Sequence, residues 1–257
     1  LADGSIAKSR ILGKFRLGGM KLTNPVTVGD EVLLRFENDG TALIEEILPR
    51  KNYVVRQSPR KKNFLHLLAS NIDQALLIAT IVQPDLKPGL IDRFLLMTEP
   101  YDIPVIIVLN KSDLWDDHNH ETFGILKMIY ENIGYKVLAT SSTHNEGIEE
   151  VREALKDKTT LIAGQSGVGK STLANAIQPN LGLRTTELSD YTGKGQHTTT
   201  FAEMFELEFG GKILDTPGIK TLSFNNLEVM DVAHNFREFF KLSDECKFAN
   251  CTHRNEP

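Results

Sequence analysis

The pattern with the clearest chemistry is a glycine-rich octapeptide that ends in lysine and serine, Gly164-Gln165-Ser166-Gly167-Val168-Gly169-Lys170-Ser171. It follows a short strand expected over 160–163 and precedes a helix expected over 172–177, which is the context of a phosphate-binding loop. Its glycines let backbone N–H groups face the α- and β-phosphates of a nucleotide, while Lys170 reaches the β- and γ-phosphates and the Ser171 hydroxyl binds Mg²⁺. We place Thr172, at the start of that helix, in the same site. A glycine-rich turn that binds nothing is the alternative, and the strand–loop–helix context disfavours it.

A second motif, Asn110-Lys111-Ser112-Asp113, directly follows an apolar strand expected over 105–109. Guanine carries adjacent donors at N1 and N2, and the single carboxylate of Asp113 accepts from both. Adenine lacks that pair of donors and would leave the carboxylate unpaired, and sites of this kind reject the wrong ligand by about 10⁴–10⁵. We expect Asn110 to brace the loop and Lys111 to lie over the base plane. Alone the tetrapeptide is more often a surface turn, but beside a phosphate-binding loop it predicts guanine recognition.

Two further loops complete the expected site. Asp215 opens the sequence Asp215-Thr216-Pro217-Gly218 after a strand expected over 212–214. We expect Asp215 to hold Mg²⁺ through water and the Gly218 amide to sense the γ-phosphate. Ser141 and Ser142 follow a strand over 136–139, where a backbone N–H would contact guanine O6. Taken alone, this serine loop carries little information.

A polar loop over 193–200 stands in the place of a first switch. One of its threonines is expected to complete the Mg²⁺ shell; we take Thr199, although the sequence does not choose among the three. Ile219 occupies the position where Ras-type GTPases have a glutamine that orients the attacking water. Intrinsic hydrolysis is therefore expected to be slow, and His197 is the candidate to orient that water. A solvent-exposed side chain without chemistry is the alternative for His197.

Catalysis also needs positive charge at the phosphate that is transferred. Neither 193–200 nor 215–220 contains an arginine, so no arginine finger is available from these two segments. We therefore assign this charge to Lys170 and Mg²⁺.

The order of the motifs along the chain is unusual. Ordinary G domains begin with the phosphate-binding loop and end with the two base-recognition loops. Here the base-recognition loops at 110–113 and 141–142 come first, and the motif at 215–218 comes last. The same site is therefore expected from a circularly permuted chain, in which the segment after Gly218 continues directly into the C-terminal part.

The elements that must position these motifs alternate between strands and helices from about residue 70. Strands are expected over 75–82, 105–109, 136–139, 160–163 and 212–214, and helices over 90–97, 121–132, 148–155 and 172–177. Continuous apolar strands are typical of parallel sheets that are buried on both faces. The fold class is thus multidomain, and its centre, residues 67–222, is expected to be an α/β circularly permuted P-loop GTPase domain.

Residues 1–66 differ from the rest of the chain in charge and in pattern. They hold 12 Lys/Arg against 7 Asp/Glu, whereas the remaining residues hold 17 against 27. Short strands are expected over 11–17, 32–36, 41–47 and 53–55. Such a pattern predicts an OB-type β-barrel that binds RNA through a basic groove and aromatic side chains. A solvated basic face is the alternative, and Phe15, Phe36 and Tyr53 are more often core residues than stacking platforms in so small a barrel.

Residues 223–257 are expected to form a helical module with a zinc site. After a helix over 228–242 come Cys246, Cys251 and His253, which are three of the four N/S ligands that zinc prefers. Reduced structural cysteines are the alternative for the two thiols. Asp244 is another candidate ligand, and His234 is expected to pack or to face solvent.

The permuted order, the preceding barrel, the Gly193–Thr200 loop and the Cys/His tail together resemble the YjeQ/RsgA family of small-ribosomal-subunit-dependent GTPases. The resemblance implies an OB barrel on ribosomal RNA, a permuted GTPase core and a C-terminal zinc domain. It also implies GTP hydrolysis stimulated by the small subunit late in its assembly, with the switch histidine as the proposed water-orienting group. The family pattern places a fourth zinc ligand, a cysteine, beyond Pro257.

Composition excludes several other classes of protein. The longest apolar stretch, 75–82, is far shorter than the ~20 residues of a membrane span, and no export signal is visible. Two cysteines do not make a disulfide framework, so a reduced, cytoplasmic setting is expected. A monomer is expected as well. Two other functions are alternatives: an RNA-binding sensor of guanine nucleotides in which hydrolysis is incidental, and a P-loop kinase, which the guanine motif disfavours.

Overall fold

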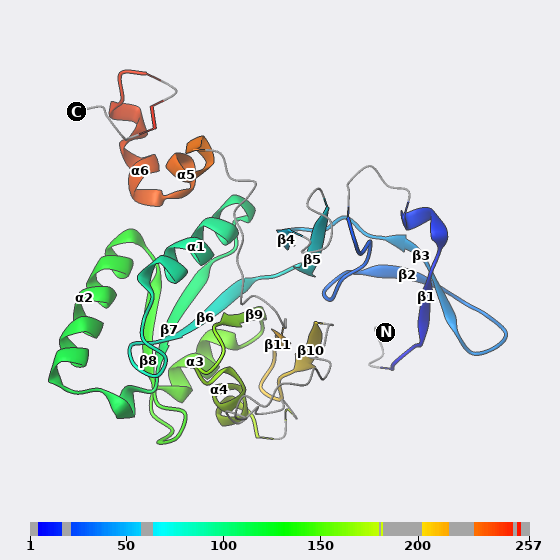
Figure 1. The fold of residues 1–257 in the computed structure, drawn as a ribbon. Helices are drawn as coiled ribbons and strands as arrows, with labels where there is room; N and C mark the ends of the chain where they lie inside the picture. The colour runs from blue at the N-terminus through cyan, green and yellow to red at the C-terminus, as the bar shows by residue number, and fades with distance from the viewer. Residues whose placement is uncertain are drawn as a thin grey trace, which may run out of the picture. The chain divides into compact units, whose positions relative to one another are not determined.

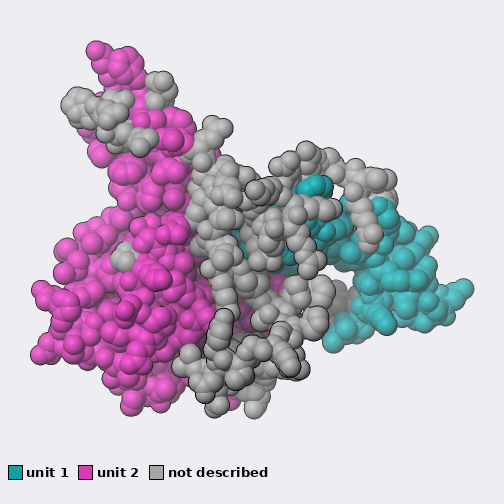
Figure 2. Space-filling model, viewed as in Figure 1, with its two compact units in different colours: residues 1–72 teal, residues 73–257 magenta. Residues whose placement is uncertain are grey.

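The chain divides into two compact units, residues 1–72 and 73–257, which Figure 2 shows in different colours. The computed structural model describes residues 5–16, 22–57, 64–179, 181, 202–215, 229–248 and 251–252. The division falls later than the expected boundary at residue 66, because the strand over 65–70 pairs with the strand over 53–57 and so belongs to the first unit.

The described residues of the first unit form two small sheets. One has the order β1-β3-β2, with β1 parallel and β2 antiparallel to the central strand; the other is an antiparallel pair. The strands are β1 (Ser9–Ile11), β2 (Val32–Phe36), β3 (Ala42–Ile47), β4 (Tyr53–Gln57) and β5 (Leu65–Ser70). The closure of these strands into one OB-type barrel stays a prediction.

One expected strand of this unit is wrong. The alternating pattern over 11–17 predicted a strand, but β1 ends at Ile11 and residues Gly13–Arg16 form a 3₁₀ helix. The turn closes when the Phe15 N–H donates to the Leu12 carbonyl at 3.2 Å. Gly13, which has no side chain to hold it in a sheet, lies where the strand stops.

A polar cluster holds the first unit together around the turn at 28–30. Arg50 pairs with Asp30 at 2.6 Å, and the Ser70 hydroxyl donates to the same carboxylate at 2.6 Å. Burial opposes ionisation here, but the hydrogen bonds from Arg50 and Ser70 lower the pKa of Asp30. A Cβ on Gly29, whose φ is +91°, would lie 2.0 Å from the Ser70 carbonyl oxygen, so this close approach requires glycine.

The three aromatic residues of this unit differ in exposure. Phe15 and Tyr53 are half-buried, whereas Phe36 is 59% exposed. Phe36 is therefore not a core residue, which corrects the reading of all three as packing residues. The exposed ring remains available for contact with a partner.

The second unit is built on a six-stranded sheet of order β10-β11-β9-β6-β7-β8 (Figure 1). All neighbouring pairs are parallel except β10 with β11. The strands are β6 (Gln74–Thr80), β7 (Val105–Asn110), β8 (Lys136–Thr140), β9 (Thr159–Gly164), β10 (Glu203–Glu206) and β11 (Lys212–Asp215). The parallel core was expected from the sequence, and the antiparallel edge strand β10 was not.

Helices cover both faces of this sheet because its strands are apolar on both sides. The helices are α1 (Pro88–Thr98), α2 (Asp117–Ile133), α3 (Ile148–Leu155) and α4 (Lys170–Ile177). Alternate residues of β6 and β7, such as Leu76 and Val108, join the buried side chains of α3 and α4 in one core. Their neighbours in the strands, such as Leu77 and Ile107, are equally buried. Figure 1 shows α1 and α2 on the other side of the strands.

The expected helix over 228–242 is two helices, α5 (Val229–Asn235) and α6 (Arg237–Leu242). Phe236 between them has extended backbone angles, φ −88° and ψ 113°, which interrupt the helix. The second helix starts at Arg237, whose Nε lies 2.6 Å from Glu99 Oε1 and whose guanidinium lies 4.2 Å from the centre of the Tyr135 ring. The break thus lets the C-terminal helices attach to the end of α1.

None of the helices in the described part of the chain is both long enough and apolar enough to cross a membrane.

Candidate nucleotide-binding site

The parallel sheet brings the predicted motifs to one edge. Asn110 ends β7, Ser141 follows β8, Gly164 ends β9 and Asp215 ends β11. Since these four strands are parallel, their carboxyl ends lie at the same edge of the sheet, where open α/β folds bind ligands. Segments separated by more than a hundred residues are therefore collected into one site.

The loop between β9 and α4 has the backbone shape of a phosphate-binding loop. Gly164 and Gly169 have φ of 150° and 90°, which other residues rarely adopt. A Cβ on Gly164 would lie 2.3 Å from the Ile78 carbonyl oxygen, and one on Gly169 would lie 2.5 Å from Asn110 Nδ2. Both glycines are thus required by close approach of neighbouring strands and loops.

The helix that follows this loop begins two residues earlier than predicted. α4 starts at Lys170, so that Lys170, Ser171 and Thr172 form its first turn, where unpaired N–H groups attract phosphate. The Lys170 ammonium donates to the carbonyl oxygens of Gly164 at 2.9 Å and Gln165 at 2.5 Å. The cation is therefore held at the mouth of the loop that would surround a phosphate.

Asn110 joins the phosphate-binding loop to the base-recognition loops. Its side chain is buried at 1% exposure, and its Nδ2 donates to the Val168 carbonyl at 2.9 Å. Its Oδ1 accepts from the hydroxyls of Thr140 at 2.9 Å and Ser142 at 3.0 Å. One buried amide thus links β7, the loop after β8 and the loop after β9.

The predicted base-recognition carboxylate, Asp113, lies beside Ser141. The Ser141 hydroxyl donates to Asp113 Oδ1 at 2.5 Å, and the carboxylate side chain is 18% exposed. This hydrogen bond is the main cause of a lowered pKa at Asp113; burial opposes it, and a backbone hydrogen bond, His144 and Thr143 add smaller lowering contributions. The carboxylate is therefore charged at neutral pH, as an acceptor for guanine must be.

Both the backbone and the side chain of Lys111 have a defined conformation. Its φ is 67°, in the left-handed region, and its Nζ donates to the Gln83 carbonyl at 2.5 Å. The loop after β6 therefore fixes the lysine that was expected to lie over the base plane. The sequence offered no signal for the contribution of Gln83.

The loop after β8 is closed on itself. Ser141 and Glu146 exchange two backbone hydrogen bonds of 3.0 Å each, and Ser141 is fully buried. Gly147 follows with a φ of 68° and lies against the Ala139 carbonyl. The closed loop holds Ser141 against Asp113 and Ser142 against Asn110.

Asp215 lies at the phosphate end of the site, paired in register with Ile162 on the neighbouring strand. Burial raises the pKa of this half-buried carboxyl group, while the nearby Lys170 ammonium lowers it. An acidic oxygen next to the first turn of α4 suits Mg²⁺, which prefers carboxylate and hydroxyl oxygens. Three predicted residues of this end, His197, Thr199 and Gly218, lie outside the described residues.

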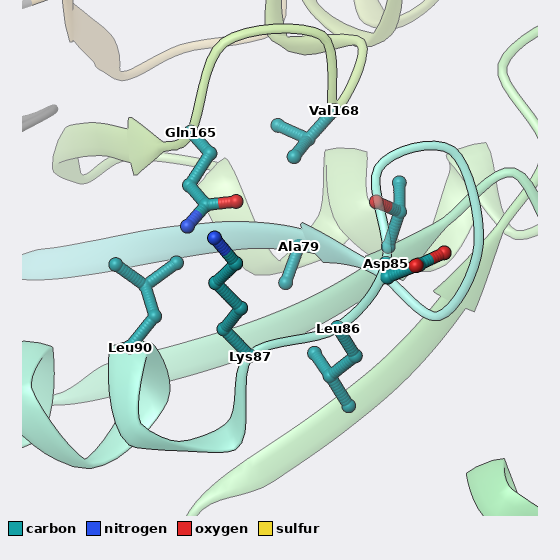
Figure 3. Close-up of a pocket in the computed structure, with 8 residues that line it drawn as sticks. Ala79, Asp85, Leu86, Lys87, Leu90, Gln165 and Val168 are labelled. Carbon is teal, nitrogen blue, oxygen red and sulfur yellow. The ribbon is translucent and has the colours of Figure 1, made fainter.

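A small, open hollow borders the phosphate-binding loop (Figure 3). Gln165 and Val168 of the loop line it together with Leu86, Lys87 and Leu90. The side chains of Lys87 and Gln165 point toward each other in this view. The hollow lies on the flank of the loop, and none of the predicted base-recognition residues is part of its lining.

The described part of the C-terminal module supplies two thiols. Cys246 is half-buried, Cys251 is 6% exposed, and they are not joined in a disulfide. Across the described ranges, no group of three or more His, Cys, Asp or Glu side chains could hold a metal ion. His253 lies beyond the described residues, and His234 is exposed on α5, edge-on to Phe240.

The structure also adds residues that sequence reasoning missed. Thr140 contributes to the Asn110 network, and His144 lies 3.8 Å from Asp113. The sequence did offer a signal for Thr140. This hydroxyl residue directly follows the strand expected over 136–139, and the carboxyl ends of parallel strands lie at the same edge of a sheet, where Asn110 also lies. Nothing in the sequence spacing indicated the position of His144.

Three comparisons with known proteins agree with this arrangement. The family model described as RsgA GTPase matches residues 47–225. The small ribosomal subunit biogenesis GTPases RsgA of Phocaeicola vulgatus and Bacteroides fragilis are each 46% identical over 255 residues, which are 99% of this chain and 82% of each relative.

Solved structures show the same architecture. YjeQ from Thermotoga maritima is 36% identical, with a TM-score of 0.76 over 97% of this chain and 79% of that one. YloQ, described as a circularly permuted GTPase, is 35% identical, with a TM-score of 0.68 over 93% and 74% of the two chains.

Proposed function

Because the chain belongs to the RsgA GTPase family, we propose that it hydrolyses GTP to GDP and phosphate in the biogenesis of the small ribosomal subunit. The observation that carries this proposal is the buried Asn110 amide, which joins a phosphate-binding loop to a guanine motif in the permuted order. The relatives named above are described as GTPases of small-subunit biogenesis, and the chain spans most of their length.

Guanine selection is assigned to the base end of the site. Asp113 accepts from the N1 and N2 donors of the base, and Ser141 keeps the carboxylate charged and in place. Lys111 borders the base plane, and backbone N–H groups of the loop at Ser141 and Ser142 serve the O6 oxygen. Adenine would leave a shielded carboxylate without its two donors.

Phosphate binding is assigned to the other end. The backbone N–H groups of residues 164–172 surround the α- and β-phosphates, and Lys170 moves from its loop carbonyls to the β- and γ-phosphates. Mg²⁺ would be held by the Ser171 hydroxyl, by Thr199 and, through water, by Asp215, and it would neutralise charge on the phosphates. The Gly218 amide is the proposed contact to the γ-phosphate.

Hydrolysis requires an attacking water that this chain must orient without a glutamine after Gly218. We assign that role to His197, since an imidazole can accept a proton near neutral pH. The Ile219 side chain can neither donate nor accept a hydrogen bond. The assignment predicts slow turnover by the isolated protein and faster turnover when a partner fixes the histidine.

The remaining parts of the chain are assigned by family membership and by composition. The basic unit over residues 1–66 is proposed to be an OB-type barrel on ribosomal RNA, and its exposed Phe36 supports a stacking contact. The C-terminal module is proposed to hold a structural zinc through Cys246, Cys251 and His253. The chain is expected to act as a monomer in the cytoplasm, where ribosomal subunits assemble.

Zinc can be tested without reference to activity. Metal analysis of the purified protein is expected to give one zinc per molecule. The variant Cys246→Ser should lose most of it, whereas Ser243→Ala, a neighbouring change outside the thiols, should retain it. An equal zinc content in all three proteins would contradict the assignment.

A guanine-nucleotide sensor is the second candidate function, and it is favoured if hydrolysis does not matter for release from the subunit. Sedimentation of His197→Ala with small subunits and GTP distinguishes the two functions. A hydrolysis-driven factor should remain trapped on the subunit in the variant, while the wild-type protein dissociates. Equal dissociation of the two proteins would favour the sensor.

A further inference from the structure

The base-recognition end contains a histidine that the proposed function leaves unused. His144 lies in the closed loop after β8, and its side chain is 63% exposed. Its backbone N–H donates to the Ser141 hydroxyl oxygen at 3.2 Å, and the paired backbone of Ser141 and Glu146 fixes the loop on both sides. The backbone of His144 is therefore fixed beside the site.

The imidazole faces the carboxylate that would bind guanine. His144 Nδ1 lies 3.8 Å from Asp113 Oδ2, while Asp113 Oδ1 already accepts from Ser141. From its own loop the ring also meets the hydroxyls of Ser141 at 3.2 Å and Thr143 at 3.3 Å. Among the described residues, Asp113, on the turn after β7, is the charged group that faces it.

The two protonation states of the ring act differently on this carboxylate. The single Ser141 proton is donated to Asp113, so a neutral imidazole with Nδ1 as acceptor takes a hydrogen bond from the Thr143 hydroxyl and leaves the carboxylate to the donors of guanine. An imidazolium carries a proton on Nδ1 and a positive charge, so it pairs with the same oxygen that guanine needs. Histidine side chains change charge between pH 5 and 8, which includes cellular conditions.

We propose that His144 is a specificity residue of the guanine site, whose protonated form pairs with Asp113 and weakens guanine-nucleotide binding as the pH falls. The inference rests on the proposed guanine-binding function. It adds to the base end a residue whose effect on binding depends on pH.

Calorimetric titration of the full chain with GDP and Mg²⁺ at pH 7.8 and pH 5.8 tests the proposal. The affinity of the wild-type protein should fall between these values about threefold more than that of His144→Gln, as expected for a partly exposed ion pair. Glutamine keeps hydrogen bonds to the loop hydroxyls but takes no charge. Since GDP itself titrates in this range, the result is the ratio between the two proteins.

His118→Gln serves as the matched control, because it removes an exposed histidine from α2 and should keep the wild-type ratio. Thermal melting of each variant shows that the fold is intact. A second readout follows from linkage: near pH 6.3, GDP binding should release more protons from the wild-type protein than from His144→Gln, measured in buffers of different ionisation enthalpy.

Identical pH profiles and proton release for wild type and His144→Gln would overturn this inference while leaving the guanine site intact. A chain that binds ADP as tightly as GDP at pH 7.8 would overturn the guanine assignment as well. The two failures are therefore distinguishable in one set of titrations.

Discussion

The two ends of the nucleotide site are held in place by different means. At the base end, side chains from three loops bond to one another: Asn110 to Ser142 and to the Val168 carbonyl, and Asp113 to Ser141. At the phosphate end, the shape comes from glycine backbone, and the charges of Lys170 and Asp215 lie near each other. The base end is thus bonded internally, whereas the phosphate end concentrates charge.

The two carboxylates express this contrast in opposite directions. The hydrogen bond from Ser141 lowers the pKa of Asp113, so its ionised form is stabilised by the fold. Burial raises the pKa of Asp215, so its ionised form is disfavoured until a cation offsets it. Base recognition is thus built into the folded chain, while the phosphate end gives up stability for ligand binding.

The largest expected effect comes from removing the cation of the phosphate end. Lys170→Ala should lower the rate of GTP hydrolysis by up to about 10³-fold, because a positive group aimed at the transferring phosphate is lost. Single-turnover hydrolysis at saturating GTP measures this. Lys127→Ala, an exposed lysine on α2, is the control. A Lys170→Ala variant that hydrolyses GTP within tenfold of the wild-type rate would show that the charge of Lys170 contributes little to catalysis.

A change at the base end should alter which nucleotide binds and leave phosphate chemistry intact. Asp113→Asn should weaken GTP binding by about 10²-fold and improve XTP binding, because the asparagine amide donates to the xanthine C2 carbonyl. Competition titrations with GTP, XTP and ATP measure it, with Asp117→Asn as the control. Unchanged preference for GTP would show that Asp113 does not contact the base.

The link between the two ends is tested by Asn110→Ala. Loss of this amide leaves the Val168 carbonyl and the Thr140 hydroxyl without their partner, which should cost about 1–3 kcal/mol of unfolding free energy. Denaturant unfolding measures it, and Asn132→Ala, an exposed position on α2, should change little. If both variants unfold alike, the base end is not held by this network.

The smallest expected effect is a gain in stability at the phosphate end. Asp215 has a raised pKa in the fold, so its contribution to stability is full at low pH and is lost as the pH rises through the folded value. At pH 7, Asp215→Asn should therefore melt about 1–3 °C higher than wild type, although its Mg²⁺-dependent hydrolysis falls. The advantage should disappear near pH 3.5, and a lower melting temperature at pH 7 would contradict the contrast.

Much of the second unit was predictable from the sequence because its signals are local. Apolar runs placed β6 and β7 to within one or two residues, and Gly164 to Ser171 predicted its own strand–loop–helix context. Family membership, predicted from the order of the motifs, is confirmed. Glycine and apolar patterns act over a few residues, so they can be read without knowing the fold.

What the sequence missed depends on contacts between distant segments. Val168 lies 58 positions from Asn110, and Arg237 lies 138 positions from Glu99, so no local pattern reports either pair. β10 was missed because its residues are largely exposed and lack an apolar run. The break at Phe236 was missed because the apolar spacing continues through it.

The proposed function requires that this site hydrolyses GTP in response to the small ribosomal subunit. GTP turnover is therefore measured for the purified chain alone, with small subunits and with large subunits. We expect slow turnover alone and strong stimulation by small subunits only, which His197→Ala should abolish. Equal turnover under all three conditions would contradict it.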